Sequence, residues 1–361
     1  MKKIITLSLG LLCALGFAQD GAPAAPYYNG FNFNQTGMAL KAALADKIST
    51  THTRQLTYSQ VWDAIKNTDL DPNDSQYVLL LYGFSANVCP ASPSDDSEHR
   101  RRLKESNGGA TSCEWNREHA FPQSLGNPEL GQMGPGADAQ LLRACDVDRN
   151  GARANKPYAA GSGNSGPVSN AYWYPGDEWK GDVARILMYM YLRYGDQCLP
   201  KVAATGATVA SDSNMPEILL QWNAEDPTSR YEDNRNTYLG NANNTYGQGN
   251  RNPFIDNPYL ATLIWGGPVA QDRWGIAGTV TVNDLQVAVF PNPAINHEVN
   301  VYTSNDIEQI EVVNLNGQLV QKVSKPQAVN HTYTVKDLPT GFYILKMTSG
   351  NQSTAKKVIV N

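Results

Sequence analysis

The pattern of apolar residues changes near residue 280, and this change constrains the fold more than any other sequence feature. Residues 55–274 are rich in Trp, Tyr and Asn and place apolar residues at helical spacing. From residue 285 onward the chain carries short alternating runs, separated by turn signals such as Asn316-Gly317. The runs cover 287–290, 299–302, 307–313, 332–335 and 342–347. The sequence therefore predicts a helix-rich α+β domain followed by a small all-β sandwich.

Four segments of the first region are predicted to be helices. The clearest is 181–194, where Val183, Ile186, Leu187 and Met190 recur at the spacing of one helix face. The others are 38–49, 59–67 and 215–222. The β region, at roughly 75 residues, is long enough to hold a modest core of its own.

The N-terminus is typical of an exported protein. Lys2 and Lys3 precede an apolar run over 4–15, and Gly16-Phe17-Ala18 offers small residues for cleavage. The run is too short for a membrane helix, and Leu12 is bulky for a lipoprotein signal at Cys13. We therefore expect a signal peptide over 1–18 and a secreted or cell-surface product.

Four cysteines follow the leader, and an even number in an exported chain suggests two disulfides. None belongs to a Cys-x-x-Cys pair, which argues against zinc binding or redox chemistry. Of the three pairings, we favour Cys89 with Cys113 and Cys145 with Cys198. Buried free thiols are the alternative.

Two blocks of the first region carry residues suited to phosphodiester cleavage. The block 113–124 places Glu118 directly beside His119, and the block 146–157 contains Asn150 between arginines. Cleavage assisted by a metal needs oxygen ligands for a hard cation, a base for water and cations for the phosphate. Neighbouring strand residues point to opposite faces, so Glu118 and His119 can share a site only where a strand ends. Pro122 is consistent with that end, and Asp146 or Asp148 can cap a helix that contains Asn150.

The two blocks closely resemble the bacterial endonuclease I family, a branch of the His-Me finger (ββα-metal) nucleases, and the likeness runs from about residue 58 to 265. The resemblance implies that His119 is the general base and that Glu118 and Asn150 bind the metal. Asn155 competes with Asn150 for the metal. Mg²⁺ suits one carboxylate, one amide oxygen and several waters, with Ca²⁺ or Mn²⁺ as alternatives.

Arginine can grip phosphate oxygens in two places, and Arg117, Arg143 and Arg153 are the candidates. We favour Arg143, then Arg153, as catalytic residues. Substrate binding is assigned to Arg117, Asn155 and Arg251. The block 249–256 around Arg251 also matches the family, although a buried turn with hydrogen-bonding side chains is the alternative for it.

Two features depart from what the family leads us to expect. Family members commonly carry Asp-Leu-His-His-Leu-Arg-Pro, whereas residues 138–144 read Asp-Ala-Gln-Leu-Leu-Arg-Ala, without the two histidines. If those histidines only buttress the site, activity survives, whereas activity is weak or lost if one of them takes part in the chemistry. The preserved Glu118, His119 and Asn150 favour activity. The formal net charge is −5, although a sequence-independent DNA binder normally has a basic footprint. The run 99–104 offers a local basic patch, or simply a solvated loop.

The C-terminal region resembles the sorting domain of the Bacteroidetes type IX secretion system. The residues that carry this resemblance are 289–294, 313–317, 338–343 and the end 356–360. A carbohydrate- or substrate-binding β module is the alternative, but no cluster of aromatic residues supports it.

Together these observations predict a signal peptide over 1–18, a nuclease domain over 19–275 with a ββα-metal core, a linker over 276–286 and a sorting domain over 287–361. The expected function is a secreted, metal-dependent, non-specific endonuclease that hydrolyses phosphodiester bonds of DNA, with RNA left open as a second substrate. Its other partner is the type IX secretion machinery, and no membrane span is expected. The alternative is a non-catalytic exported protein that binds nucleic acid or surfaces.

Overall fold

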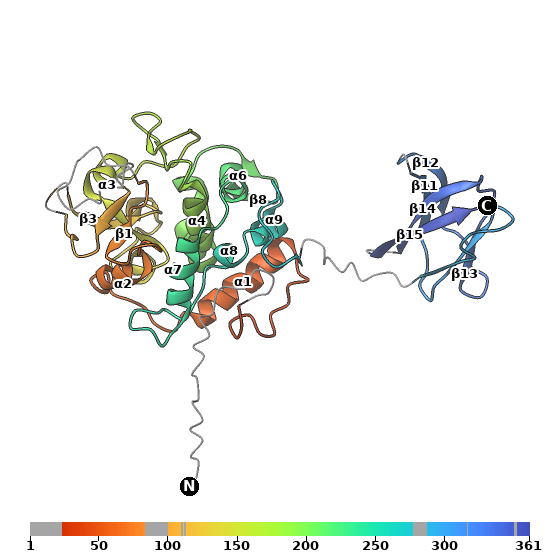
Figure 1. Ribbon diagram of the computed structural model, residues 1–361, viewed down its shortest axis with the longest axis horizontal. Coiled ribbons are helices and arrows are strands. Elements are labelled where there is room, and N and C mark those ends of the chain that lie inside the picture. The colour runs from red at the N-terminus through yellow and green to blue at the C-terminus, as the bar shows by residue number, and fades with distance from the viewer. Residues whose placement is uncertain are drawn as a thin grey trace, which may run out of the picture. The chain divides into compact units, whose positions relative to one another are not determined.

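The computed structural model describes residues 24–83, 100–109, 111, 113–276, 287–315, 317–349 and 352–361. The chain forms two compact units, Met1–Ala277 and Gly278–Asn361 (Figure 1). The first combines helices with short strands, and the second is built from strands. The expected signal peptide, Cys89, His99 and residues 277–286 of the expected linker lie outside the described residues.

The longest helices of the first unit pack around α4. Each residue from Gly181 to Leu192 of this helix is buried, because it is covered on all sides by other elements. Helices α1 and α6 both contact it. The helix bounds are α1 Gly37–Thr51, α2 Gln60–Thr68, α3 Val147–Arg153, α4 Lys180–Tyr194, α5 Pro200–Ala203, α6 Glu217–Glu225, α7 Arg230–Gly240, α8 Pro253–Asp256 and α9 Tyr259–Trp265. The four predicted helices are present, with ends displaced by at most three residues.

The strands of the first unit form antiparallel pairs. They are β1 Tyr77–Leu79 with β2 Arg101–Leu103, β3 Trp115–His119 with β4 Leu142–Asp146, β5 Gly166–Pro167 with β6 Trp173–Tyr174, and β7 Thr208–Val209 with β8 Asp212–Pro216. Short 3₁₀ turns lie at η1 Gln123–Leu125, η2 Gly134–Ala137 and η3 Gly195–Cys198. The pair β3–β4 is followed directly by α3, which contacts both strands.

The β3–β4 pair lies between two apolar clusters. On one side Trp115, Leu142 and Ala144 pack with Val61 and Ile65 of α2. On the other side Cys145 belongs to the large cluster that includes the residues of α4. All five residues of β4 are buried, so this strand is a rigid support for whatever lies at the end of β3.

The predicted pairing of Cys145 with Cys198 is wrong, because both are buried free thiols. Cys145 lies in β4, where burial and then the carboxylates of Glu118 and Asp146 raise its pKa. Cys198 lies in η3, where burial and then Asp138 raise its pKa to about 12. Both thiols are enclosed in the large apolar cluster of the first unit, one from β4 and one from η3. The pairing of Cys89 with Cys113 stays a prediction.

The arginines of the basic run are neutralised by carboxylates rather than gathered into a patch. Arg100 pairs with Glu178 at 2.8 Å, and Arg101 with Asp71 at 3.3 Å. Arg102 is buried and pairs with Asp146 at 2.8 Å. The described part of the run therefore does not provide the expected basic footprint, because β2 brings its arginines against acidic partners.

The second unit consists of two sheets around one core. One sheet has the order β13–β10–β9 and the other β12–β11–β14–β15. The bounds are β9 Ala288–Phe290, β10 Val299–Tyr302, β11 Gln309–Asn314, β12 Leu319–Ser324, β13 Thr332–Val335, β14 Gly341–Ser349 and β15 Gln352–Val360. The core takes Val301 and Tyr333 from the first sheet and Val312, Leu345 and Val358 from the second. This is the predicted sandwich, although β12 and β15 were not among the five predicted runs.

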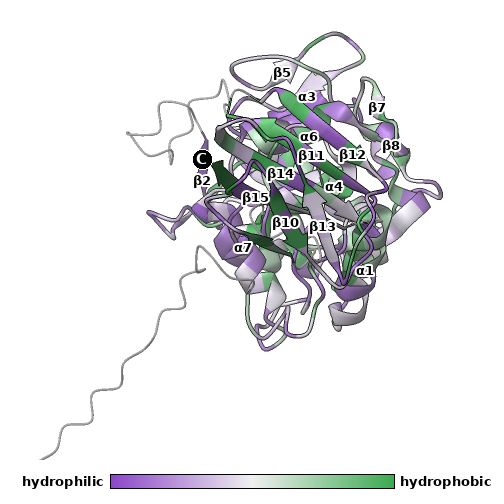
Figure 2. Cartoon of the chain, turned by 90° about the vertical axis from the view of Figure 1, so that its right-hand side faces the viewer, coloured by the Kyte–Doolittle hydropathy of each residue, from purple (hydrophilic) through white to green (hydrophobic). Residues whose placement is uncertain are grey.

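Hydrophobic and hydrophilic residues alternate along these strands, as Figure 2 shows by colour. In β10, β11, β13 and β14 the alternation places one face of the strand in the core and the other toward solvent. Among the described residues, no helix has the length and apolar character needed to cross a membrane.

Candidate active site

A cleft of about 340 Å³ lies at the end of β3, beside α3. It is lined by Tyr58, Arg117, Glu118, His119, Pro122, Gln123, Ser124, Asn150, Arg153, Ala154 and Asn155. The sequence blocks 113–124 and 146–157 therefore meet in space, although about thirty residues separate Glu118 from Asn150 along the chain. Their meeting follows from the pairing of β3 with β4, which leads directly into α3.

Glu118 and His119 reach this cleft from opposite sides of β3, as expected for neighbours in a strand. Glu118 contacts Tyr82 and Arg153 on one side. The His119 ring stacks on Tyr58 on the other side, with 5.5 Å between ring centroids and 23° between ring planes. Both residues line one cleft because His119 is the last residue of β3.

The imidazole of His119 is fixed in one tautomer. Its Nε2 lies 2.8 Å from the carbonyl oxygen of Gly136, and since a carbonyl can only accept, Nε2 carries the proton. Nδ1 is then an unprotonated acceptor. Burial, followed by the charges of Arg117 and Arg153, lowers the pKa of His119 to about 4. The ring is therefore neutral at pH 7, and a weaker base than the unperturbed imidazole we expected from the sequence.

The Glu118 carboxylate is buried and held through one of its two oxygens. Oε1 accepts a hydrogen bond from the Tyr82 hydroxyl at 2.7 Å and pairs with Arg153 Nη1 at 3.0 Å. Among the described residues no hydrogen bond reaches Oε2. Burial raises the pKa of Glu118, and the charge of Arg153 opposes that effect.

Asn150 is placed by the helix α3 and by contacts back to β3. Asp146 caps α3 by accepting hydrogen bonds from the backbone of Asp148 and Arg149. The Asn150 amide nitrogen donates to Asn116 Oδ1 at 2.7 Å and to the Arg117 carbonyl at 3.4 Å. Its Oδ1 has no hydrogen bond among the described residues.

Asn155 lies just beyond α3 and lines the same cleft. Its side chain is exposed, and its amide nitrogen donates to Ser124 Oγ at 3.2 Å. The geometry therefore brings both asparagines to the cleft and does not by itself choose between them as a metal ligand.

The oxygen ligands present are compatible with a hard cation. Glu118 Oε2 and Asn150 Oδ1 are one carboxylate and one amide oxygen without partners in the described chain, which suits a cation that keeps most of its waters. The described residues contain no group of three or more His, Cys, Asp or Glu side chains that could hold a metal. A closed, zinc-type site is therefore not formed by this part of the chain.

The comparisons with known proteins agree with this arrangement. The family model for endonuclease I matches residues 36–259. The chain belongs to the endonuclease I family. The chain is 39% identical to an extracellular ribonuclease of Bacillus amyloliquefaciens over 241 residues, covering 64% of this chain and 75% of that protein. It is 38% identical to an extracellular ribonuclease of Bacillus subtilis over 259 residues, covering 68% and 82%.

The family model for the secretion system C-terminal sorting domain matches residues 288–361. This endonuclease I family member is therefore a nuclease destined for secretion or the cell surface, and the non-catalytic alternative is set aside. Among solved structures, PorZ of the Porphyromonas gingivalis type IX secretion system matches 21% of this chain and 11% of its own, at 17% identity and a TM-score of 0.17. That score is too low to support a structural inference.

Two arginines that we assigned to the site lie elsewhere in this endonuclease I domain. Arg143 is buried, with its guanidinium bonded to the Tyr231 hydroxyl at 3.0 Å and to Asp182 at 3.1 Å. Arg251 forms a buried pair with Asp256, with N–O distances of 2.6 to 3.0 Å. Neither lines the cleft, so the expected roles of Arg143 in catalysis and Arg251 in substrate binding are corrected. Acidic partners in the interior neutralise both charges.

Arg153 and Arg117 do line the cleft, in different ways. The Arg153 guanidinium is buried, pairs with Glu118, and donates to the carbonyl oxygens of His119 at 3.0 Å and Ala120 at 2.9 Å. This makes it a support for Glu118 rather than an open phosphate ligand. Arg117 is half-buried, lies 3.4 Å above the Tyr58 ring and donates to the Tyr58 carbonyl oxygen.

Residues 138–144, which lack the two histidines of the family, lie in the interior and hold neighbouring elements together. Gln140 is buried and donates to Asn236 at 3.2 Å, and Leu141 belongs to the large apolar cluster. Asp138 accepts hydrogen bonds from Tyr189, Tyr194 and Gln248. Neither Gln140 nor Leu141 lines the cleft, so the positions without histidine buttress the domain.

Sequence reasoning missed two tyrosines of the site. Tyr58 directly precedes the predicted helix 59–67 and carried no sign of a role in the site, yet it stacks on His119. Tyr82 carried no signal at all, because its contact with Glu118 joins positions 36 residues apart.

Proposed function

We propose that this endonuclease I family member is a metal-dependent, non-specific endonuclease that cleaves DNA and RNA, with His119 as general base and Glu118 and Asn150 as metal ligands. The observation that carries the proposal is the convergence of the His119 ring, the Glu118 carboxylate and the Asn150 amide on one cleft. The order β3, β4, α3 around that cleft supports a ββα-metal (His-Me finger) core.

His119 is suited to take a proton from water. Its Nε2 is tied to the Gly136 carbonyl and its ring is held by Tyr58, so the unprotonated Nδ1 has a defined orientation. A base that is already oriented avoids the entropy loss of ordering during the reaction. The neutral form predominates at pH 7, since burial lowers the pKa of His119 to about 4.

Glu118 Oε2 and Asn150 Oδ1 are the proposed protein ligands, and Asn155 is the competing amide. A bound Mg²⁺, Ca²⁺ or Mn²⁺ would stabilise the negative charge that develops on the phosphate and the leaving oxygen. The convergence of Glu118, Asn150 and His119 on one cleft, through α3 and the end of β3, supports this assignment. Arg117 remains the proposed phosphate contact, because its charge lies at the cleft wall.

RNA deserves equal weight with DNA as a proposed substrate. Both curated relatives named above are extracellular ribonucleases, and each is nearly 40% identical to this chain. The described residues of the cleft offer amides, hydroxyls and backbone groups rather than an extended basic surface. We therefore propose weak, salt-sensitive binding without sequence preference, in which the metal contributes much of the attraction for phosphate.

Digestion of plasmid DNA and of a defined RNA, with Mg²⁺ and with EDTA, tests this function. The parent should cleave with Mg²⁺ and stop in EDTA. His119→Ala should lower turnover about a hundredfold or more, the usual scale for a lost general base, with its folding transition preserved. His331→Ala, in the other unit, is the matched control. Unchanged cleavage in EDTA would refute metal dependence, and near-normal turnover of His119→Ala would refute the base.

A further inference from the structure

Tyr82 lies behind the proposed metal ligand and contacts it directly. Its hydroxyl donates to Glu118 Oε1 at 2.7 Å, and both side chains are buried. Arg153 pairs with the same oxygen at 3.0 Å. Both contacts thus fall on Oε1, and among the described residues none falls on Oε2.

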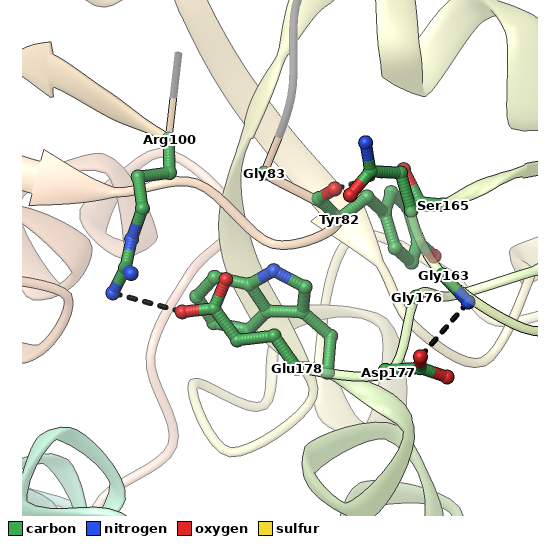
Figure 3. A pocket seen from close by; sticks show the side chains of 10 residues that line it. Tyr82, Gly83, Arg100, Gly163, Ser165, Gly176, Asp177 and Glu178 are labelled. Atoms are coloured by element: carbon green, nitrogen blue, oxygen red, sulfur yellow. Dashed lines mark hydrogen bonds and ion pairs between the residues drawn. The ribbon is translucent and has the colours of Figure 1, made fainter. Parts of the chain in front are cut away.

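Backbone hydrogen bonds and a left-handed backbone conformation hold Tyr82 in this position. Leu81 pairs with β4 through a hydrogen bond to the Ala144 carbonyl at 2.7 Å, so the segment approaches the site from beside β4. Tyr82 then adopts a φ of +74°, a left-handed conformation that is rare for a bulky residue. Its carbonyl accepts a hydrogen bond from Ser165 Oγ at 2.8 Å, and Figure 3 shows these two residues side by side. Strained residues of this kind often serve functional sites.

The ring of Tyr82 is enclosed as well. It packs edge-on against Trp173 at 5.6 Å between centroids, and its hydroxyl lies 2.6 Å from that of Tyr158. The Tyr158 hydroxyl also contacts the Ala120 carbonyl at 2.8 Å. The hydroxyl of Tyr82 therefore has little freedom to move away from Glu118.

We infer that Tyr82 is a positioning residue that, together with Arg153, fixes the Glu118 carboxylate so that Oε2 alone is presented to a metal in the cleft. This inference rests on the proposed function of Glu118. The physical reason lies in the geometry of the guanidinium, which can bind both oxygens of a carboxylate at once. Without the Tyr82 hydroxyl, Glu118 can turn both oxygens toward Arg153 and withdraw Oε2 from the cleft.

Tyr82→Phe tests the inference because it removes the hydroxyl and keeps the packed ring. Tyr189→Phe is the matched control, since Tyr189 is also buried and donates to a carboxylate, Asp138, at 2.7 Å, but Asp138, unlike Glu118, does not line the cleft. We would measure the binding of Mn²⁺ alone to the metal-free, full-length protein by calorimetry. Tyr82→Phe should weaken Mn²⁺ binding about tenfold, the scale found for partners that orient a metal ligand. Tyr189→Phe should bind Mn²⁺ as the parent does.

Thermal unfolding of both variants in EDTA separates positioning from loss of structure, since each loses one buried hydroxyl–carboxylate bond. Mn²⁺ affinity of Tyr82→Phe equal to that of the parent, or an equal loss in Tyr189→Phe, would overturn the inference. Glu118→Gln distinguishes the two proposals. If Glu118→Gln binds Mn²⁺ normally, the metal assignment fails; if it binds weakly while Tyr82→Phe binds normally, only the role of Tyr82 fails.

A double variant completes the test. Because Tyr82 is inferred to act through Glu118, Tyr82→Phe added to Glu118→Gln should produce no further loss of Mn²⁺ affinity. Additive losses would mean that Tyr82 affects the metal by another route and would contradict the inference.

Discussion

Two arginines close together in the sequence have different surroundings in this nuclease. Arg143 and Arg153 are ten positions apart and both are buried, but Arg143 is bonded to Tyr231 and Asp182 whereas Arg153 supports Glu118 at the cleft. The distinction depends on which acidic partner each guanidinium meets. A buried charge without such a partner would be strongly destabilising.

The Mg²⁺ dependence of cleavage by variants of Asn150 and Asn155 distinguishes which of the two asparagines binds the metal. Asn150→Ala should raise the Mg²⁺ concentration for half-maximal cleavage at least tenfold, on the scale expected when a ligand to a weakly held cation is lost. Asn155→Ala should change it less, because Asn155 is exposed and lies beyond α3. A Mg²⁺ titration of the cleavage rate provides the measurement. A larger effect of Asn155→Ala than of Asn150→Ala would identify Asn155 as the metal ligand.

The stability of the metal-free protein should fall as the pH is lowered below about 6.5, partly because of His52. Burial lowers the pKa of His52 in the folded state, so below its unfolded pKa of about 6.5 the unfolded chain binds more protons than the folded one. This contribution is fully present above pH 6.5 and is lost as the pH falls through the folded pKa. Its slope can reach about 1.4 kcal/mol per pH unit.

Urea unfolding in EDTA between pH 7 and 5 measures this slope. His52→Gln should flatten it, while His119, whose pKa is lowered to about 4, continues to contribute in the same direction. His331→Gln, in the other unit, should leave the slope of the first unit unchanged. An unchanged slope in His52→Gln would contradict the prediction.

At the scale of elements, the joint between β4 and α3 is held by one carboxylate. Asp146 Oδ1 accepts from the backbone of Asp148 at 3.0 Å and Arg149 at 3.1 Å, and Oδ2 pairs with Arg102 at 2.8 Å. The residue therefore links β2, β4 and the helix that carries Asn150. This joint is the reason that the two sequence blocks keep a fixed geometry.

Asp146→Ala should reduce the free energy of unfolding of the first unit by about 3–5 kcal/mol, because it removes the carboxylate that both pairs with the buried Arg102 and caps α3. Ser229→Ala is the control: Ser229 caps α7 without a buried ion pair and should lose only about 1 kcal/mol. Urea unfolding followed by tryptophan fluorescence gives both values. Equal losses would show that Asp146 acts as a simple helix cap.

At the scale of the whole molecule, the two units have separate cores. The core of the first unit includes Trp274, whose ring centroid lies 5.4 Å from that of Tyr28 and 5.0 Å from that of Phe33. Ile276 packs against this core. The core of the second unit begins with Val287 and Val289 at its edge. Removing the second unit should therefore leave the first core complete.

A chain that ends at residue 277 should fold and cleave nucleic acid when produced in an oxidising compartment, and in the native host it should stall in the periplasm. A chain that ends at Gly267 is the control and should be destabilised, since it loses Trp274 and the pair of Arg273 with Asp233 at 2.7 Å. Nuclease assays, thermal unfolding and analysis of the culture medium check these outcomes. Normal release of the shortened protein would contradict the sorting role.

The sequence by itself determined the features that depend on neighbouring residues. Helix periodicity over 181–194, the alternating runs of the tail, the end of β3 at His119 and the capped helix around Asn150 all follow from spacing and local chemistry. The family and the export route were likewise readable from contiguous motifs.

Only the tertiary structure decided which side chains meet across long stretches of chain. It left Cys145 and Cys198 as free thiols, directed Arg143 and Arg251 into buried ion pairs, and brought Tyr82 to Glu118. A charge or hydroxyl that is removed from water requires a hydrogen-bonding or oppositely charged partner. Tertiary packing, rather than the nearby sequence, supplies that partner. For this reason the meeting of Glu118, His119 and Asn150 at one cleft could be predicted from two motifs, whereas the residues that surround and orient them could not.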